Sequence, residues 1–165
     1  MALTIRNISD ADWPATWRIL HATFAAGDTY TFPRDSSEEE IRRAWIDVPR
    51  ATYVACDEND EILGTYFVKP NQAGGGSHVC NCGYVVAAAA QGRGVAAAMC
   101  EHSQAEAVGM GFRAMQFNFV VSTNERAVAL WQRLGFAIVG RLPGAFLHPA
   151  RGYVDALVMF KALAT

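Results

Sequence analysis

The stretch HVCNCGYVVAAAAQGRGVAAAMCEHSQAEAVG, residues 78–109, decides the fold and carries the clearest functional signal in the chain. It begins with an apolar, strand-like run that ends at Val86, and a small-residue turn leads into Gln91-Gly92-Arg93-Gly94-Val95-Ala96. Alanine-rich sequence then predicts a helix that runs to about Gly109. Backbone N–H groups at a helix start have no partner within the helix, and glycines let an anion approach them. The stretch therefore predicts a phosphate-binding site, with a pyrophosphate as the expected ligand.

Two other interpretations of the glycines stay open at this point. Residues 92–97 also fit the dinucleotide fingerprint G-x-G-x-x-[GA], which requires an early βαβ unit and an acidic residue about 20 residues further on. About half of the chain precedes this loop, and the next predicted strand carries Gln116 and Asn118 but no carboxylate. The second alternative is an ordinary glycine-rich turn without a ligand, because one glycine motif alone is a weak signal.

The composition predicts a single domain over residues 1–165. The chain is 52% hydrophobic and 18% charged, which allows a sizeable core and argues against disorder. The net charge is −2 and no basic patch supports nucleic-acid binding. We expect a soluble, cytoplasmic protein, because no apolar run of 18 residues lacks charges or glycines and no leader-like apolar segment occurs.

The four cysteines lie in predicted strands or helices rather than in loops, which predicts reduced core thiols. His78, Cys80 and Cys82 would lie on one face of a strand and offer ligand-type side chains. Zinc sites usually use C-x₂₋₄-C pairs, and the chain contains no second pair. No metal is therefore expected.

Periodicity, capping signals and turn residues predict an element order of β-α-α-β-β-β-α-β-α-β-β. This order indicates a mixed α/β (α+β) domain with one central sheet of about seven strands, flanked by about four helices. The expected strands are residues 2–8, 51–57, 61–69, 78–87, 114–121, 136–142 and 153–161, and the expected helices end at about residues 26, 47, 109 and 134. The segment PGAFLHPARG between the last two strands is expected to be a long connection that could overhang a site.

Three features together resemble the GCN5-related N-acetyltransferase superfamily. They are the element order, the Q-x-x-G-x-A loop at 91–96, and N-x-x-A-x-x-L-W-x-x-L-G-F at 124–136. The resemblance covers essentially the whole chain. It implies a splayed pair of parallel strands, the one ending at Val86 and the one at 114–121, with acetyl-CoA between them. An acetyl-CoA-dependent N-acetyltransferase is the function that follows from it.

The same resemblance assigns roles to residues around this cofactor. Backbone groups of Val85 and Val86 would bind the pantetheine arm, Asn124 would reach the pantetheine or phosphates, and the Trp131 ring would lie beside the thiol. The N–H groups that would hold the pyrophosphate belong to Gly92, Arg93, Gly94, Val95 and Ala96, after Gln91 at the start of the motif. The family often has a tyrosine acid at the Trp131 position, and tryptophan has no titratable proton. Either the thiolate leaves unassisted, a water supplies the proton, or Trp131 is a core residue.

A narrower similarity points to the acceptor. Asn81, Asn118 and Asn124, with the ending G-x-V-D-A-x-x-x-x-K at 152–161, are similar to the proline-analogue N-acetyltransferases, which acetylate azetidine-2-carboxylate and related cyclic imino acids. That similarity implies that Asn81 and Asn118 position the substrate and take part in catalysis. From the residues alone, alternation places each amide on the face opposite its apolar neighbours. Each amide either bonds to a local backbone group or lines a cleft.

Direct transfer to a small-molecule nitrogen is the expected mechanism, with several residues as candidates for its parts. The Val85 N–H is expected to polarise the thioester carbonyl. The amine must lose a proton, for which the candidates are Asp155, His148, Glu101 or a water chain. Asp155 could equally pair with an arginine, and His148 could be an exposed loop residue.

The acceptor end of the site and the assembly complete these expectations. Tyr30 and Phe32, in the loop 28–33, are expected to bind the substrate with Asn81, Asn118 and His148, unless that loop simply packs on the core. The alternatives to a small-molecule enzyme are acetylation of a protein amine or an antibiotic, and a non-catalytic acyl-CoA-binding module. A homodimer is expected by analogy with the family.

Overall fold

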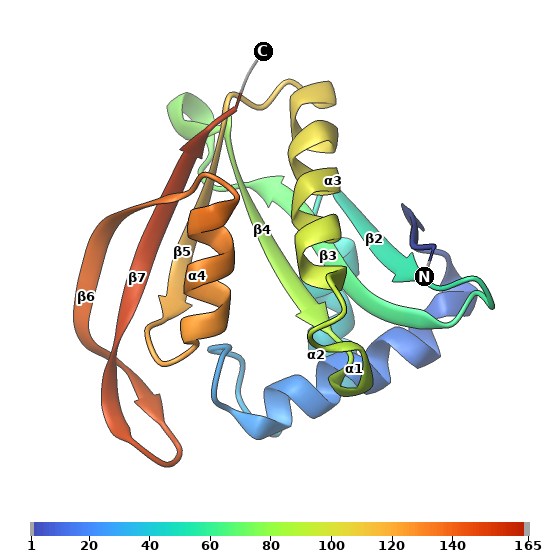
Figure 1. The fold of residues 1–165 in the computed structure, drawn as a ribbon, viewed down its shortest axis with the longest axis horizontal. Helices are drawn as coiled ribbons and strands as arrows, with labels where there is room; N and C mark the ends of the chain where they lie inside the picture. The colour runs from blue at the N-terminus through green and yellow to red at the C-terminus, as the bar shows by residue number, and fades with distance from the viewer. Residues whose placement is uncertain (1, 164–165) are drawn as a thin grey trace.

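Seven strands form one mixed sheet in the computed structural model, which describes residues 2–163 (Figure 1). In spatial order they are β1 (Thr4–Asn7), β2 (Ala51–Cys56), β3 (Ile62–Pro70), β4 (Val79–Val86), β5 (Ala114–Val121), β7 (Gly152–Ala162) and β6 (Ala137–His148). Only the central β4–β5 pair is parallel. The predicted α/β fold with a single mixed sheet is confirmed, and so is the order of its elements.

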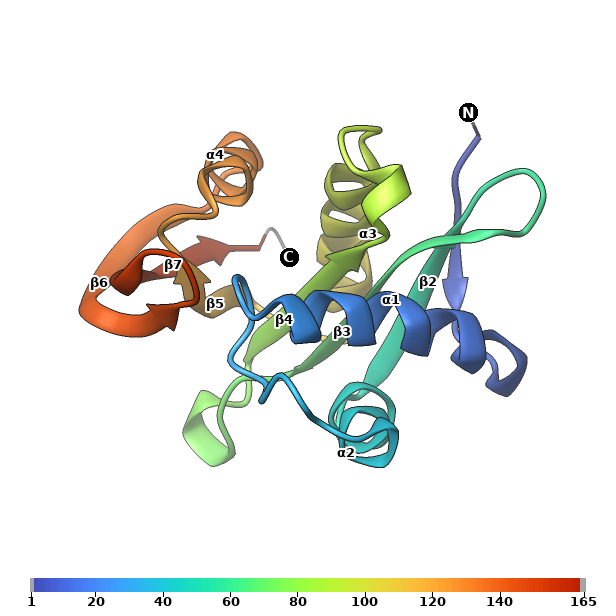
Figure 2. The same cartoon turned by 90° about the horizontal axis from the view of Figure 1, so that it is seen from below.

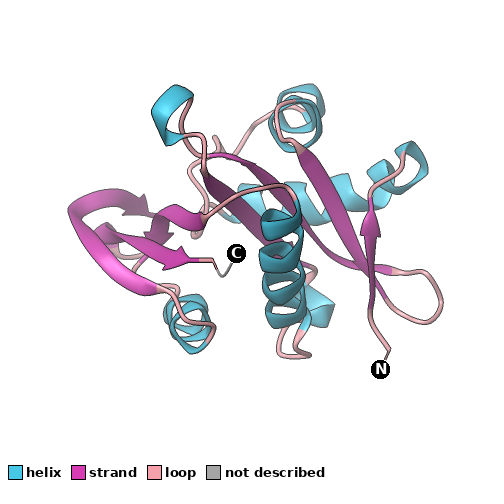
Figure 3. Ribbon diagram, turned by 90° about the horizontal axis from the view of Figure 1, so that it is seen from above, coloured by secondary structure: helices cyan, strands magenta, loops and turns pink. Residues whose placement is uncertain are grey.

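The helices cover both faces of this sheet. On one face lie α1 (Trp13–Ala26) and α2 (Glu38–Arg42), which continues as a π-helical turn (Arg43–Asp47), and on the other lie α3 (Val95–Gly109) and α4 (Glu125–Arg133). Figures 2 and 3 show these layers from opposite directions. Among the described residues, no helix is long and apolar enough to cross a membrane.

Local sequence signals set where the first two helices begin and end. Pro14 lies in the first turn of α1, and Gly27 ends that helix in the left-handed conformation with φ 69°. Ser37 caps α2 by accepting a hydrogen bond from the Glu40 N–H, and Glu40 bonds back to the Ser37 N–H. The loop 28–36 is thus held between two fixed helix ends.

Each face of the sheet has its own core. Met99, Cys100 and Ala107 of α3 pack with the strands on one face, all of them fully buried. Trp45 and Leu20 are fully buried on the opposite face, where α1 and α2 cover the sheet. Alternation along β4 sends its side chains to both cores in turn, so this strand is fixed from both sides.

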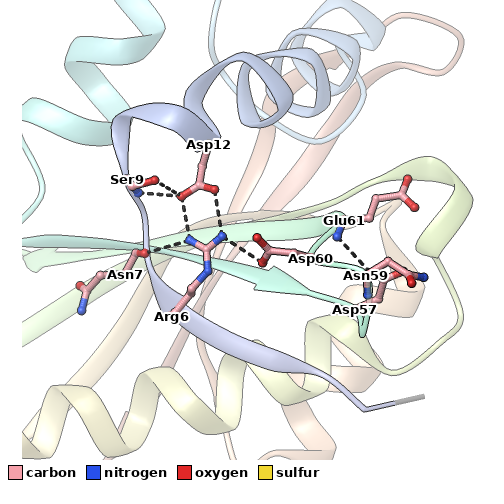
Figure 4. A network of polar contacts seen from close by, with 8 residues as sticks. All are labelled: Arg6, Asn7, Ser9, Asp12, Asp57, Asn59, Asp60 and Glu61. Atoms are coloured by element: carbon pink, nitrogen blue, oxygen red, sulfur yellow. Dashed lines mark hydrogen bonds and ion pairs between the residues drawn. The ribbon is translucent and has the colours of Figure 1, made fainter.

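An ion-pair network ties the first strand to the start of α1. Arg6 of β1 donates two hydrogen bonds to Asp12, of 2.7 and 2.9 Å, and one of 3.1 Å to Asp60 of the β2–β3 turn (Figure 4). The backbone N–H and the hydroxyl of Ser9 also donate to Asp12. The hydrogen bonds from Arg6 hold the pKa of the Asp12 carboxyl well below its usual range.

The end of the chain differs from its prediction. Strand β6 continues through Phe146, Leu147 and His148, and only residues 149–151 connect it to β7. The expectation of a long overhanging connection was therefore wrong. The register shifts between Leu142 and Phe146, and this irregularity absorbs the Pro143-Gly144 pair that had indicated a loop.

Candidate functional site

Strands β4 and β5 separate soon after they begin, and this separation creates the site. They pair only at Val79↔Ala114 and Cys80↔Met115, although β4 continues to Val86. Figure 1 shows the two strands diverging toward their carboxyl ends. A cleft of about 1480 Å³ lies at this opening and is also lined by α1, the loop after it and α4. Its volume exceeds the roughly 300–1,000 Å³ of a pocket for a drug-sized ligand.

Most of the predicted site residues line this cleft. They are Tyr30, Phe32, Asn81, Val85, Val86, Gln91, Gly92, Gly94, Val95, Ala96, Asn118, Asn124 and Trp131. Arg93 lies in the same turn with an exposed side chain. Residues from five separate parts of the chain therefore meet at one opening.

The register of β4 decides which of its backbone groups face the opening. Ala87 donates to the Leu63 carbonyl and Asn71 donates to the Val79 carbonyl, so odd-numbered residues of β4 exchange hydrogen bonds with β3. In an antiparallel pair the backbone groups of the alternate residues point away from the partner strand. The N–H and C=O groups of Cys82, Tyr84 and Val86 therefore point toward the separated β5.

This register corrects two expectations. Val85 is opposite Thr65 and directs both its N–H and its C=O to β3. These groups can therefore neither bind the pantetheine arm nor polarise a group held in the cleft. Val86 has the backbone orientation that was expected of it. The backbone N–H that faces the cleft, as was expected of Val85, is that of Tyr84, one residue earlier.

The glycine turn forms an anion site at the start of α3. Gly92 and Gly94 have φ angles of 77° and 80°, in the left-handed region that favours glycine. Gly94 is the N-cap of α3 and makes no side-chain cap, so the first N–H groups of this 15-residue helix have no intrahelical acceptor. The helix dipole adds positive potential at the same point. This geometry suits a pyrophosphate.

Cations add to the anion-binding character of the cleft. The Arg126 Nη2 atom of α4 lies 3.5 Å from where a Cβ of Gly92 would stand. Four basic residues line the cleft, namely Arg18, Lys69, Arg126 and Arg133, against the two acidic residues Asp28 and Glu61. The surplus of positive charge favours an anionic ligand.

Two of the predicted cofactor residues also have structural roles. Asn124 caps α4 by accepting a hydrogen bond of 3.4 Å from the Ala127 N–H. Trp131 is buried, and its ring lies 5.1 Å from the Tyr84 ring and 5.2 Å from the Phe117 ring. Trp131 is thus a core residue that also forms part of the cleft wall, so the two interpretations of this residue are compatible.

Four amide side chains gather where the strands begin to separate. Asn81 Nδ2 donates to the Gln116 carbonyl across the β4–β5 gap, at 3.0 Å. Asn118 Oδ1 accepts from Gln116 Nε2 at 2.9 Å, and Asn118 Nδ2 donates to Asn71 Oδ1 at 2.7 Å. Each amide keeps hydrogen-bonding capacity beyond these contacts. The cluster therefore combines a fixed orientation with free donors and acceptors.

An aromatic wall lies on the same face of the sheet as Asn81, at Gly83, two residues further along β4. Tyr30 donates a hydrogen bond of 2.9 Å to the Tyr84 carbonyl, and its ring packs with Phe24 and Phe32. Burial raises the pKa of the Tyr30 phenol well above its usual value, so this hydroxyl stays protonated. A Cβ at Gly83 would stand 2.6 Å from the Phe67 ring and 3.2 Å from the Tyr30 hydroxyl. Glycine is thus required there for the wall to pack against the strand.

The predicted acid–base residues lie elsewhere. Asp155 accepts hydrogen bonds from Arg141 at 2.8 Å and from the Gly144 N–H at 2.9 Å. The Gly144 N–H, followed by Arg141, lowers its pKa below the usual value. His148 Nδ1 accepts from the Ala150 N–H in the β6–β7 hairpin, and Glu101 is exposed on α3. None of the three lines the cleft, and Asp155 has the arginine partner that the sequence analysis offered as its alternative.

Sequence reasoning missed several residues of the site. Asn71 follows Pro70 outside every motif of the sequence, yet its side chain accepts a hydrogen bond from Asn118. Arg126 carried no signal, because a long basic side chain looks the same in the sequence on any exposed surface. The Tyr84 N–H could have been predicted if the register with β3 had been known, because the backbone groups of alternate residues in β4 point away from β3.

The thiols offer no nucleophile to the cleft. All four cysteines are free and buried. Burial raises the pKa of Cys82 well above its usual value, and it raises the pKa of Cys100 to about 11. A thiol with a raised pKa stays protonated near neutral pH, and the thiolate is the reactive form. No group of three or more potential metal ligands occurs among the described residues.

Comparison with known proteins agrees with this geometry. The curated N-acetyltransferase aca1 of Schizosaccharomyces pombe is 32% identical over 111 residues, which cover 67% of this chain and 53% of that protein. The chain thus spans about half the length of this relative. The structure of a GCN5-related N-acetyltransferase from Kribbella flavida is 43% identical, with a TM-score of 0.94 and 98% of each chain covered.

A more distant structure shares the fold and contains a ligand. The phosphinothricin acetyltransferase of Sinorhizobium meliloti, solved in complex with acetyl-CoA, is 20% identical with a TM-score of 0.85. The alignment covers 99% of this chain and 90% of that one. Residues 6–136 match the model of the acetyltransferase (GNAT) family, and the chain belongs to this family.

Proposed function

We propose that this protein transfers the acetyl group of acetyl-CoA directly to the amino or imino nitrogen of a small molecule, with cyclic imino acids as the leading acceptors. The observation that carries this proposal is the separation of β4 and β5. A glycine turn at one end of the opening suits a pyrophosphate, and an amide cluster under an aromatic wall lies at the other end. The distance from Asn81 to Val86 along the strand is roughly 17 Å, enough for an extended arm between the two.

The backbone of β4 would orient the thioester. The carbonyl and N–H groups of Cys82 and Val86 face the opening and would bond to the pantetheine arm. The Tyr84 carbonyl accepts from Tyr30, and the Tyr84 N–H would polarise the thioester carbonyl. A donor aimed at developing negative charge contributes about 3 kcal/mol to catalysis. Asn81 and Asn118 would hold the acceptor so that its nitrogen faces that carbonyl.

The reaction then needs one proton removed and one supplied. The acceptor nitrogen attacks the carbonyl carbon and loses its proton, while the C–S bond breaks and the thiolate leaves. Water ordered by the four amides is our candidate for receiving the proton, because Asp155, His148 and Glu101 do not line the cleft. Direct transfer is supported by Cys82, the cysteine that lines the cleft, because burial raises its pKa well above the usual value and so disfavours the thiolate that would carry the acetyl group.

Features of the cleft favour a small acceptor over a polypeptide. The loop that carries Tyr30 and Phe32 lies across the opening, and basic residues outnumber acidic ones along the walls. A peptide acceptor would be better served by an open, acidic groove. A non-catalytic acyl-CoA-binding module is the second candidate, and the tryptophan at position 131, where the family often has a tyrosine acid, is the observation that favours it.

The test is thiol release from acetyl-CoA across a panel of cyclic imino acids, α-amino acids and short peptides. Wild type and Asn118→Ala are compared, with acetyl-CoA affinity measured separately by calorimetry. Turnover on an imino acid that Asn118→Ala loses, with acetyl-CoA affinity unchanged, supports the proposal. Binding of acetyl-CoA without turnover on any amine would overturn it in favour of the binding module.

Two lesser proposals concern assembly and location. A homodimer is supported by β6, a 12-residue edge strand whose exposed side chains include Val139 and Leu147. Light scattering at micromolar concentration tests this, and a monomer mass would overturn it. A cytoplasmic location is supported by the four buried, unpaired cysteines and is tested by fractionation of cells that express the tagged protein.

A further inference from the structure

Lys69 is a charged residue of the cleft that the proposed chemistry does not use. It lies near the end of β3, lines the cleft and is half-buried. Its ammonium lies 5.2 Å from the centre of the Phe67 ring. Within the described residues no carboxylate lies within ion-pair distance of it. The other lysine of the chain, Lys161, donates instead to Gln104 and to the Leu134 carbonyl.

The sheet register places Lys69 beside the acceptor amides. Lys69 is directly opposite Asn81 in the β3–β4 ladder, and Phe67 is directly opposite Gly83. Directly opposed residues have their Cβ atoms roughly 5 Å apart on the same face of the sheet. Phe67 also lies on this face, two residues from Lys69 along β3. The cation, the aromatic ring and the Asn81 amide therefore share one patch of the cleft wall.

A half-buried cation without an anionic partner is costly unless something compensates its charge. The cation–π contact with Phe67 compensates part of this charge. The end of the cleft with the glycine turn has its own cation in Arg126, next to Gly92, so Lys69 is not needed for the pyrophosphate. A negative group on the acceptor would supply the missing partner.

We propose that Lys69 binds the carboxylate of the acceptor and so restricts the enzyme to amino or imino acids over amines that lack a carboxylate. The carboxylate would accept from the Lys69 ammonium and from an amide of the cluster. The apolar ring of a cyclic imino acid would then pack on Phe67 and Tyr30, which leaves its nitrogen toward the β4 backbone. This inference rests on the proposed acetyl transfer and names the class of its acceptor.

The experiment compares an acid with its neutral analogue. Acetylation of azetidine-2-carboxylate and azetidine-2-carboxamide is measured with wild type, Lys69→Met and Lys69→Arg. Arg43→Met serves as the control for general loss of positive charge, because Arg43 is exposed in the π-helical turn after α2 and does not line the cleft. Wild type should prefer the acid by about 10- to 100-fold in kcat/KM, the scale of a hydrogen bond to a charged group.

The variants separate recognition from structure. Lys69→Met should remove the preference, because it lowers kcat/KM for the acid and leaves kcat/KM for the carboxamide unchanged. Lys69→Arg should retain most of the preference for the acid. Arg43→Met should leave that preference intact. Equal loss on acid and carboxamide in Lys69→Met would overturn the proposal, since that pattern indicates a structural role. A wild type without preference would overturn it as well. If neither compound is acetylated by wild type although other amines are, the acceptor class is wrong; if no amine is acetylated at all, the proposed function itself fails.

Discussion

The two edges of β4 differ in a way that explains the site. On the β3 side the ladder is continuous from Pro70↔Cys80 to Gly64↔Val86, so backbone groups on that edge are hydrogen-bonded. On the β5 side only two register pairs form before the strands separate. The same strand is thus anchored on one edge and open on the other. Unpaired backbone groups then become available to a ligand without any loss of anchoring.

The same contrast divides the sheet into two halves. The half from β1 to β4 is covered by α1, α2 and α3, and the half formed by β5, β7 and β6 is covered by α4 (Figure 2). The halves meet at the short paired segment and at the side-chain bond from Asn81 to the Gln116 carbonyl. Substitutions at the edge of β4 that faces β5 should therefore change activity. Substitutions elsewhere in the half from β1 to β4, which we call the closed half, should change stability.

Asn81→Ala should have the largest effect on turnover. It removes the amide that bridges the opening strands and one donor of the acceptor site. We expect kcat to fall about 100-fold, the scale of one well-aimed hydrogen-bond donor, with acetyl-CoA affinity retained. Steady-state kinetics and calorimetry measure the two quantities. Asn59→Ala, in the exposed β2–β3 turn, is the matched control. A change in kcat of only twofold in both variants would show that Asn81 does not belong to the site.

Asp12→Ala should destabilise the closed half without affecting acetyl-CoA binding. It leaves Arg6 and Ser9 without their shared acceptor, which should reduce the free energy of unfolding by about 1.5–3 kcal/mol. Urea denaturation at pH 7 measures this. The matched control is Asp10→Ala, because the Asp10 carboxylate pairs with Arg42 at an almost fully exposed position.

The pH dependence of this difference has a definite sign. The pKa of Asp12 is lower in the folded state than its usual value, so its stabilising contribution is fully present above the unfolded-state pKa of about 3.9. That contribution is lost as the pH falls through the folded-state pKa. The gap between wild type and Asp12→Ala should therefore narrow on acidification below pH 4. A gap that stays constant would show that Asp12 acts through packing.

Gly94→Ala should weaken acetyl-CoA binding by a smaller amount. A left-handed backbone costs about 1–2 kcal/mol for a residue with a Cβ, and this strain falls on the helix start that would hold the pyrophosphate. We expect the dissociation constant to rise about 10-fold. Gly109→Ala, at the other end of α3 and with open space around it, should leave the affinity unchanged. Equal effects of both substitutions would contradict an anion site at the turn.

The sequence was sufficient for the parts of the fold that depend on local signals. Caps at Ser37 and Gly27, alternation in the strands and the glycine turn each act within a few residues, so the element order followed from them. The end of β6 was predicted to be a loop because Pro143 and Gly144 give the same sequence signal in a loop and in a strand irregularity. Pairing with β7, which no local pattern reports, made the difference.

The sequence predicts those site residues that belong to a motif. It does not predict residues whose orientation depends on the register between two strands. The loop residues and both strand asparagines reach the cleft as expected. The role predicted for the Val85 N–H was wrong because the direction of a backbone N–H depends on which residues of β3 are opposite. The loop between β3 and β4 is long, so the sequence does not set this register. Lys69 and Arg126 were missed because a long cationic side chain gives the same sequence signal on any surface.

The smallest effect is expected for Asp155→Asn, and this makes it a sharp test of where the chemistry occurs. A carboxylate in an apolar strand was a reasonable candidate base from the sequence. In the folded protein it instead bonds to Arg141 and to the Gly144 N–H, within the β6–β7 pair and outside the cleft. Its lowered pKa also makes it a weak proton acceptor. Activity should change by no more than about twofold, the scale of a surface ion pair, across the pH range where kcat/KM is measured. A loss of 100-fold, with acetyl-CoA affinity and unfolding midpoint unchanged, would move the proton acceptor from the amide-ordered water to this strand pair and would require the hairpin to close over the opening.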